Sequence, residues 1–121
     1  MWREWLPGTH VNAIGAPPRS DYREIDSAAA ARAQLFVDHL ETALHESGDI
    51  LIPISEGAFR QSNLAATLGE VLAETHPGRT NDDAVTVFDA VGTGIQDLAV
   101  ASFFVNAARA AGTGIDFPFF A

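Results

Sequence analysis

The sequence contains no cysteine and no lysine, and all seven of its cationic side chains apart from histidine are arginines. The absence of cysteine excludes disulfides, thiolate zinc sites and cysteine nucleophiles. The absence of lysine excludes Schiff-base chemistry and a P-loop lysine. No apolar run approaches the roughly 20 residues that span a membrane, and the opening residues MWREWLPG do not form a signal peptide. We therefore expect a cytoplasmic protein without a membrane partner.

Positive charge is scarce overall, because 7 Lys+Arg stand against 16 Asp+Glu and the net charge is −9. An acidic chain with scattered arginines repels phosphate backbones, so we expect no nucleic-acid partner. The length of 121 residues and the 47% hydrophobic content fit one globular domain, residues 1–121.

The stretch that organises the chain is VTVFDAVGTGIQDLAVASFFVNAARAAG, residues 85–112. Its first residues are β-branched or aromatic on both faces, which predicts a short buried strand of a parallel sheet. Glycines end the strand, and residues 95–111, free of Pro and Gly, predict a long helix. Apolar residues nearly encircle this helix, so we expect it to be buried in the core or against another chain. Phe88 of the strand and Phe103 of the helix are expected to be buried in the core.

Two further strands are predicted at residues 10–15 and 35–38, in addition to residues 85–89. Short helices are predicted at residues 28–33, with Asp26 or Ser27 as the cap, and at residues 41–46. Strands separated by helical connections favour an α/β fold with a parallel sheet. About three strands make half of a doubly wound, Rossmann-like sheet.

Two apolar segments lie between these elements. Because Pro53 cannot donate a hydrogen bond within a sheet, residues 50–54 are predicted to form an edge strand or an extended loop. Leu64, Leu68, Val71 and Leu72 have the spacing of an amphipathic helix.

The motif that most resembles a ligand site is the hexapeptide from Gly92 to Asp97, GTGIQD, which approximates the dinucleotide fingerprint G-x-G-x-x-G. Asp97 occupies the position of the third glycine, which allows close helix–strand packing, and Asp116 falls after the helix rather than on a second strand. A helix-start turn is therefore favoured over a phosphate site.

Metal and catalytic residues do not stand out. None of the four histidines, His10, His39, His45 and His76, has a histidine partner at helical spacing, so surface or capping roles are favoured. The loop carboxylates Asp21, Glu24 and Asp26 fit turns and helix caps. We predict no metal site and assign no catalytic residue.

Several segments taken in order resemble a known family: GTHVNAIGA, REID, LFVDH, ESGDILIPISEG, LGEVL, PGRTNDDAVTVFDAVGTGIQDLAVA and AARAAGTG. From Trp5 to Gly114 the chain resembles the C-terminal part of the ornithine cyclodeaminase and mu-crystallin family. The resemblance implies the second half of an NAD(P)-binding domain, from a family that acts on amino acids or cyclic imines and has a separate dimerisation platform.

The same resemblance implies which parts of the site we expect to be present. The family's phosphate loop, ribose partner and substrate-carboxylate residues lie upstream of the matching region, so we expect them to be absent. Pro17 stands where some members carry an aspartate, and Asp21 is out of register with that role. The carried-over residues lie near the nicotinamide half of the cofactor in the family: Asn12, Gly15, Ala16, Val91 and Gly92.

The hypothesis that follows is a truncated homologue that is not a competent enzyme alone and acts as a small oligomeric or partner-binding protein. The alternative keeps weak NAD(P) binding, or reductase or deaminase activity, after self-assembly or complementation by a separate chain. A small-molecule binder with a new pocket also stays open. We expect a homo-oligomer, a dimer or a dimer of dimers, formed by the last helix with its tail at residues 117–120 rather than by the edge strand at residues 10–15.

Overall fold

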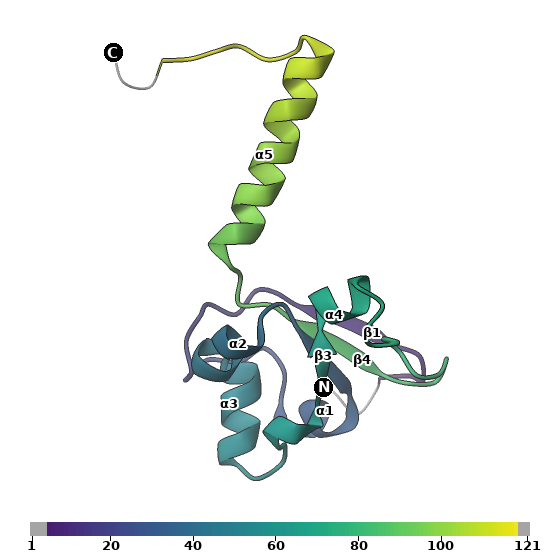
Figure 1. Ribbon diagram of the computed structural model, residues 1–121. Coiled ribbons are helices and arrows are strands. Elements are labelled where there is room, and N and C mark those ends of the chain that lie inside the picture. The colour runs from purple at the N-terminus through teal and green to yellow at the C-terminus, as the bar shows by residue number, and fades with distance from the viewer. Residues whose placement is uncertain (1–4, 119–121) are drawn as a thin grey trace.

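The computed structural model describes residues 5–118, which form an α/β fold around a four-stranded sheet (Figure 1). All strand pairs are parallel, and the strand order is β1-β4-β2-β3. The strands are β1 (His10–Ala13), β2 (Gln34–Val37), β3 (Leu64–Thr67) and β4 (Thr86–Asp89). The helices are α1 (Ser27–Arg32), α2 (Leu40–Glu46), α3 (Gly48–Ser55), α4 (Leu68–Leu72) and α5 (Gly94–Ala111), with a 3₁₀ turn at Gln61–Asn63. The predicted fold class and the three predicted strands are confirmed, and β3 is an additional strand.

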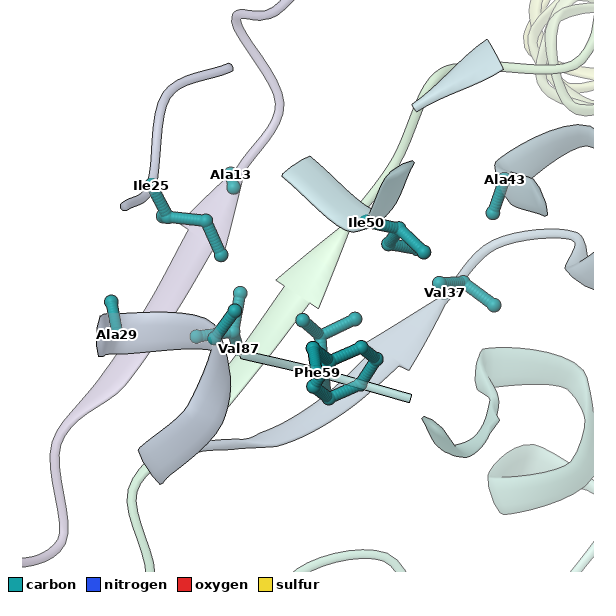
Figure 2. Packing of buried hydrophobic residues seen from close by; sticks show 10 residues of the cluster. Ala13, Ile25, Ala29, Val37, Ala43, Ile50, Phe59 and Val87 are labelled. Carbon is teal, nitrogen blue, oxygen red and sulfur yellow. The ribbon is translucent and has the colours of Figure 1, made fainter. Parts of the chain in front are cut away.

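The core lies on one face of the sheet, beneath α1 and α3 (Figure 2). Side chains alternate between the two faces of a strand, and in each of β1, β2 and β4 every second residue turns toward these helices. The core cluster contains Ala13, Leu35, Val37 and Val87 from the sheet, together with Ile25, Ala29, Ala30, Ala43, Ile50 and Phe59. The opposite face, which we call the open face, carries His10, Asn12, Phe36, Thr86 and Phe88, and α4 and its flanking loop lie against it.

The short helices begin where side-chain oxygens or nitrogens cap them. Asp26 caps α1 by accepting a 2.8 Å hydrogen bond from the Ala29 N–H, which confirms one of the two predicted caps. His39 caps α2, because its Nδ1 accepts from the Thr42 N–H. One of the four histidines therefore has the capping role that the sequence favoured.

The prediction for residues 50–54 is wrong, because they form most of α3. A proline inside a helix removes one backbone hydrogen bond, and Pro53 lies only two residues before Ser55, the last residue of this short helix. Its ring is buried, and Ile50 on the preceding turn is fully buried in the core. The packing of this apolar helix against the sheet offsets the lost bond.

The prediction of one amphipathic helix through Leu64, Leu68, Val71 and Leu72 is also wrong. Residues 64–67 form β3, which pairs with β2, and only Leu68–Leu72 is helical. Thr67 separates the two elements by a capping box: its hydroxyl accepts from the Glu70 N–H, and the Glu70 carboxylate accepts from the Thr67 N–H. This reciprocal pair fixes the helix start at Leu68.

The long helix α5 forms as predicted but does not lie in the core. No residue of α5 is buried in the part of the chain that the structure describes, and Phe103 is 69% exposed. Figure 1 shows α5 projecting away from the sheet and its covering helices. The expectation that the chain packs around this helix is therefore wrong for the single chain; β4 is the central element. Phe119 and Phe120 of the expected aromatic tail lie outside the described residues.

Among residues 5–118, no helix combines the length and the apolar character that crossing a membrane requires.

Candidate functional site

Three neighbouring strands end in register at one edge of the sheet. Ala13 of β1 pairs with Asp89 of β4, and Asp89 pairs with Val37 of β2. The Ala90 N–H continues the β1–β4 ladder with a 3.1 Å bond to the Ala13 carbonyl. The loops that follow these strands therefore leave the sheet side by side at its carboxyl edge, where open parallel sheets bind their ligands.

The loop after β4 turns at Gly92, whose φ of +84° is a backbone conformation that favours glycine. The Gly92 N–H donates a 2.9 Å hydrogen bond to Asp38 Oδ2, and Asp38 directly follows β2. The other oxygen of Asp38 accepts from the His39 N–H at 2.8 Å. Asp38 thus ties the β4 loop to the start of α2. A Cβ built on Gly92 would meet no atom within 4 Å, so the space above this glycine is open.

The loop after β1 is held in a similar way. The Gly15 N–H donates a 2.7 Å hydrogen bond to Glu24 Oε2. A Cβ on Gly15 would lie 2.7 Å from Glu24 Oε1, so a larger residue at this position would displace the Glu24 carboxylate. The backbone N–H groups of Glu24 and Ile25 in turn donate to Asp49 Oδ1 at 2.8 and 2.7 Å.

Four of the five predicted residues lie in the loops that follow the paired ends of β1 and β4. Gly15, Ala16, Val91 and Gly92 line the carboxyl edge and form what we call the rim. Asn12 lies one residue before the end of β1, and its side chain belongs to the open face, where Oδ1 is 3.2 Å from His10 Nε2. The role of these residues in cofactor binding remains a prediction.

Buried carboxylates lie directly beneath the rim. Asp89 ends β4 on the core face and is 2% exposed; Ser47, at the α2–α3 junction, donates a 2.6 Å hydrogen bond from Oγ to Asp89 Oδ2. Burial raises the pKa of Asp89 to about 6, against the lowering effect of the Ser47 hydrogen bond and with help from the charges of Asp49, Asp38 and Glu24. Burial also raises the pKa of Asp49, whose Oδ2 is buried without a hydrogen-bond partner among the described residues.

Sequence reasoning missed these carboxylates, although a signal was present. Asp38 and Asp89 each stand at the end of an apolar run, LFVD and TVFD, and so at the carboxyl ends of adjacent strands. Glu24 belonged to the predicted loop cluster, but its contact with Gly15 was not foreseen. In the same loop Asp21 pairs with Arg19 at 2.7 Å in solvent, which is a turn role.

The rim is poorly suited to a phosphate group. The N–H groups of Gly15 and Gly92 are already bonded to carboxylates, so they are not available to a phosphate, and the carboxylates repel anions. A carboxamide N–H₂ or a cationic ring is complementary to such a rim. At the start of α5, Asp97 places another carboxylate in the first turn, which agrees with a helix-start turn rather than a phosphate site.

A metal ion has no ready place in this arrangement. Within residues 5–118 no group of three or more histidine, aspartate or glutamate side chains is arranged to hold one.

Comparison with known proteins places this geometry in context. The sequence profile of the ornithine cyclodeaminase/mu-crystallin family matches residues 1–112. Alanine dehydrogenase of Archaeoglobus fulgidus is 39% identical over 118 residues, which cover 97% of this chain and 36% of that enzyme.

Two solved structures share the fold. The Δ1-pyrroline-2-carboxylate reductase of Thermococcus litoralis, in complex with NADH and L-proline, superposes with a TM-score of 0.83 at 37% identity, over 93% of this chain and 34% of that one. An archaeal alanine dehydrogenase dimer with bound NAD superposes with a TM-score of 0.78 at 37% identity, over 95% and 35%. The chain therefore spans about a third of the length of the relatives it matches.

Proposed function

Because this chain belongs to the ornithine cyclodeaminase/mu-crystallin family, we propose that it is the part of an NAD(P)-dependent reductase or dehydrogenase that receives the nicotinamide end of the cofactor. The proposal is carried by the in-register ends of β1 and β4, which place the Gly15 and Gly92 loops side by side. Related proteins of known structure hold NADH or NAD. The nicotinamide ring supplies the hydride donor or acceptor of such reactions.

In this proposal the chain's own residues position the ring and do not perform chemistry on it. Asp38 and Glu24 fix the two glycine loops through the Gly92 and Gly15 N–H groups. The open space over Gly92 admits a flat ring, and side chains at that position would fill it. The phosphate contacts come from another segment, so the 121-residue chain alone is not a competent enzyme.

The proposal includes association with a second copy through α5. This helix exposes Ile95, Leu98, Val100, Phe103, Phe104 and Val105. Phe103 and Phe104 are packed edge to face, with ring centroids 5.6 Å apart, on a helix with no buried residue. An apolar surface of this extent marks an interface, and a two-fold axis lets one patch cover its own copy. One of the related structures is a dimer.

An NADH titration tests the cofactor role. We expect no saturable binding below about 1 mM by the isolated chain. Mixing it with the portion of Archaeoglobus fulgidus alanine dehydrogenase that this chain does not match should restore saturable binding. Calorimetry or cofactor fluorescence provides the measurement.

The matched variants for this titration are Gly92→Val and Gly57→Val. Both glycines have positive φ and open space around the missing Cβ, but Gly57 follows α3 and is remote from the rim. Gly92→Val should abolish the restored binding and Gly57→Val should keep it. Equal loss in both variants, or a complemented mixture that never binds NADH, would contradict the proposal.

A further inference from the structure

A concave site lies on the open face of the sheet, away from the rim loops. It is a pocket of about 400 Å³ between α4 and strands β1 and β4, within the size range of small-molecule sites. Figure 1 shows α4 on the side of the sheet opposite α1 and α3. The residues that line this open-face pocket are His10, Asn12, Phe36, Leu68, Val71, Gly78, Arg79, Thr86 and Phe88.

The pocket has an apolar floor. Phe36 and Phe88 are paired across β2 and β4, so their rings lie in one row of the open face. Leu68 at the start of α4 completes this surface, with 39% of its area exposed. His76 packs edge to face on Phe36, with ring centroids 5.8 Å apart, and closes the floor on the side of the loop.

One wall of the pocket is a series of side chains joined by hydrogen bonds, in which each group donates to the next. Arg79 donates from Nη2 to Thr86 Oγ1 at 3.1 Å, and Thr86 Oγ1 lies 2.7 Å from His10 Nδ1. The remaining ring nitrogen, His10 Nε2, lies 3.2 Å from Asn12 Oδ1. The neutral tautomer that satisfies every contact accepts from Thr86 at Nδ1 and donates from Nε2 to Asn12.

This direction leaves more free donors than free acceptors for a ligand. The Thr86 oxygen, His10 Nδ1 and Asn12 Oδ1 each already accept a hydrogen bond within the chain. Two groups keep free N–H donors: the Asn12 amide, and the exposed Arg79 guanidinium, of whose five N–H groups one on Nη1 is bonded to the Gly8 carbonyl and one on Nη2 to Thr86. The free N–H groups of Arg79 and Asn12 therefore favour a ligand that brings acceptor atoms.

Charge points to the same ligand class. Arg79 forms no ion pair within residues 5–118, and no carboxylate is among the lining residues of this pocket. In a chain of net charge −9, the lining of this pocket carries one arginine and no acidic side chain. The planar guanidinium of Arg79 can bind a carboxylate through two parallel hydrogen bonds. The apolar floor favours a ligand that also has an apolar body.

We propose that the open-face pocket binds a small organic monocarboxylate with an aliphatic or aromatic body, the carboxylate at Arg79 and Asn12 and the body on Phe36, Leu68 and Phe88. This site is additional to the nicotinamide rim and does not depend on it.

The test is an NMR titration of the ¹⁵N-labelled chain with 3-phenylpropionate as the probe. Saturable shifts should gather at the amides of Gly78, Thr86 and Phe88. Three comparison ligands, 3-phenylpropionamide, acetate and inorganic phosphate, each lack either the charge or the apolar body, and each should bind at least about tenfold more weakly.

Variants locate the site. Arg79→Gln should weaken binding by about tenfold or more, and Arg32→Gln, an exposed arginine on the opposite face, should leave it unchanged. Should Arg79→Gln lose its dispersed spectrum, Leu68→Glu provides the second variant, because its side chain is already partly exposed at a helix start and the new carboxylate repels the probe.

The proposal would be overturned by the absence of a saturable shift up to about 20 mM probe, or by equal binding of the amide and the acid. Shifts centred on Gly15 and Gly92 would contradict it as well. Shifts of the pocket amides on simple dilution would show that a second copy of the chain covers the pocket, which would also overturn it. The NADH titration of the rim is a separate measurement, so failure of one proposal is distinguishable from failure of the other.

Discussion

Ser47 and Asp89, 42 residues apart in the chain, share a 2.6 Å hydrogen bond in the buried interior, where the Ser47 hydroxyl donates to the carboxylate at the end of β4. The bond fixes the α2–α3 junction against the central strand. It also keeps an ionisable group in the core, directly under the rim.

The Asp89 carboxylate should make the free energy of unfolding depend on pH. Its pKa is about 6 in the folded protein, above the ordinary 3.8, so between these values the folded state binds more protons than the unfolded state. The contribution of this group to stability therefore falls as pH rises through that window. Asp89→Asn should raise the free energy of unfolding at pH 8 by up to about 3 kcal/mol and change it little below about pH 4.

Urea denaturation of both proteins at several pH values measures this effect. Asp21→Asn is the matched control, because Asp21 is exposed and its carboxylate meets only Arg19. An Asp89→Asn protein that is less stable than the parent at pH 8 would show that the charged form is required in the core.

Core truncations should separate the sheet from the long helix. Leu35 is fully buried, so Leu35→Ala should lower the free energy of unfolding by about 2–5 kcal/mol. Phe103→Ala removes a ring that is 69% exposed and should change the stability of the monomer by less than about 0.5 kcal/mol. Chemical denaturation at low protein concentration provides both values. A large loss from Phe103→Ala in a monomeric sample would mean that α5 folds back onto the body.

Gly48 should not tolerate a methyl group. A Cβ at this position would lie 1.9 Å from the Tyr22 carbonyl oxygen, a backbone atom that a side-chain rotation does not move. We expect Gly48→Ala to destabilise the protein by about 1–3 kcal/mol or more. Gly94→Ala is the control, because a Cβ there meets nothing within 4 Å and the residue starts a helix. Thermal unfolding followed by circular dichroism compares the two, and equal melting temperatures would refute the prediction.

The proposed association through α5 predicts an assembly larger than the 12.9 kDa chain. Light scattering at micromolar concentration should detect a dimer or a pair of dimers, and Leu98→Glu with Phe103→Glu should dissociate it by burying charges in the interface. Ile14→Glu changes a similarly exposed residue at the end of β1 and should have no effect. Dissociation by Ile14→Glu alone would move the interface to the strand edge, and a stable 12.9 kDa parent would refute the association.

Local sequence signals predicted the sheet better than they predicted what covers it. The β-branched run before Asp89 and the glycines after it identified β4 and the start of α5. Periodicity describes one helix at a time, so the apolar surface of α5 predicted burial in the core or against another chain without deciding between them, and no residue of α5 is buried within the described chain. The spacing of Leu64 and Leu68 fits a helix as well as a strand followed by a helix, and only the capping box at Thr67 separates them.

The glycines of the rim were predictable from the sequence, but the carboxylates that bind their N–H groups were not. Gly92 lies between a predicted strand and a predicted helix, which indicates a turn. Its bond to Asp38 joins residues 54 positions apart, and the bond between Gly15 and Glu24 depends on the path of a loop with two prolines. The open-face pocket likewise depends on which strands are neighbours, because Arg79 and His10 meet only through Thr86 of β4.

The strand order carries a consequence for synthesis of the chain on the ribosome. Both neighbours of β4 are made earlier, yet β1 pairs with no other described strand. The β2–β3 pair can form once Thr67 has left the ribosome, whereas residues 10–13 must wait until residues 86–89 emerge. Pairing across such a sequence separation is slow to nucleate. Within the sheet of residues 5–118, β1 therefore has no strand to pair with until β4 is made, and insertion of β4 between β1 and β2 completes this part of the sheet.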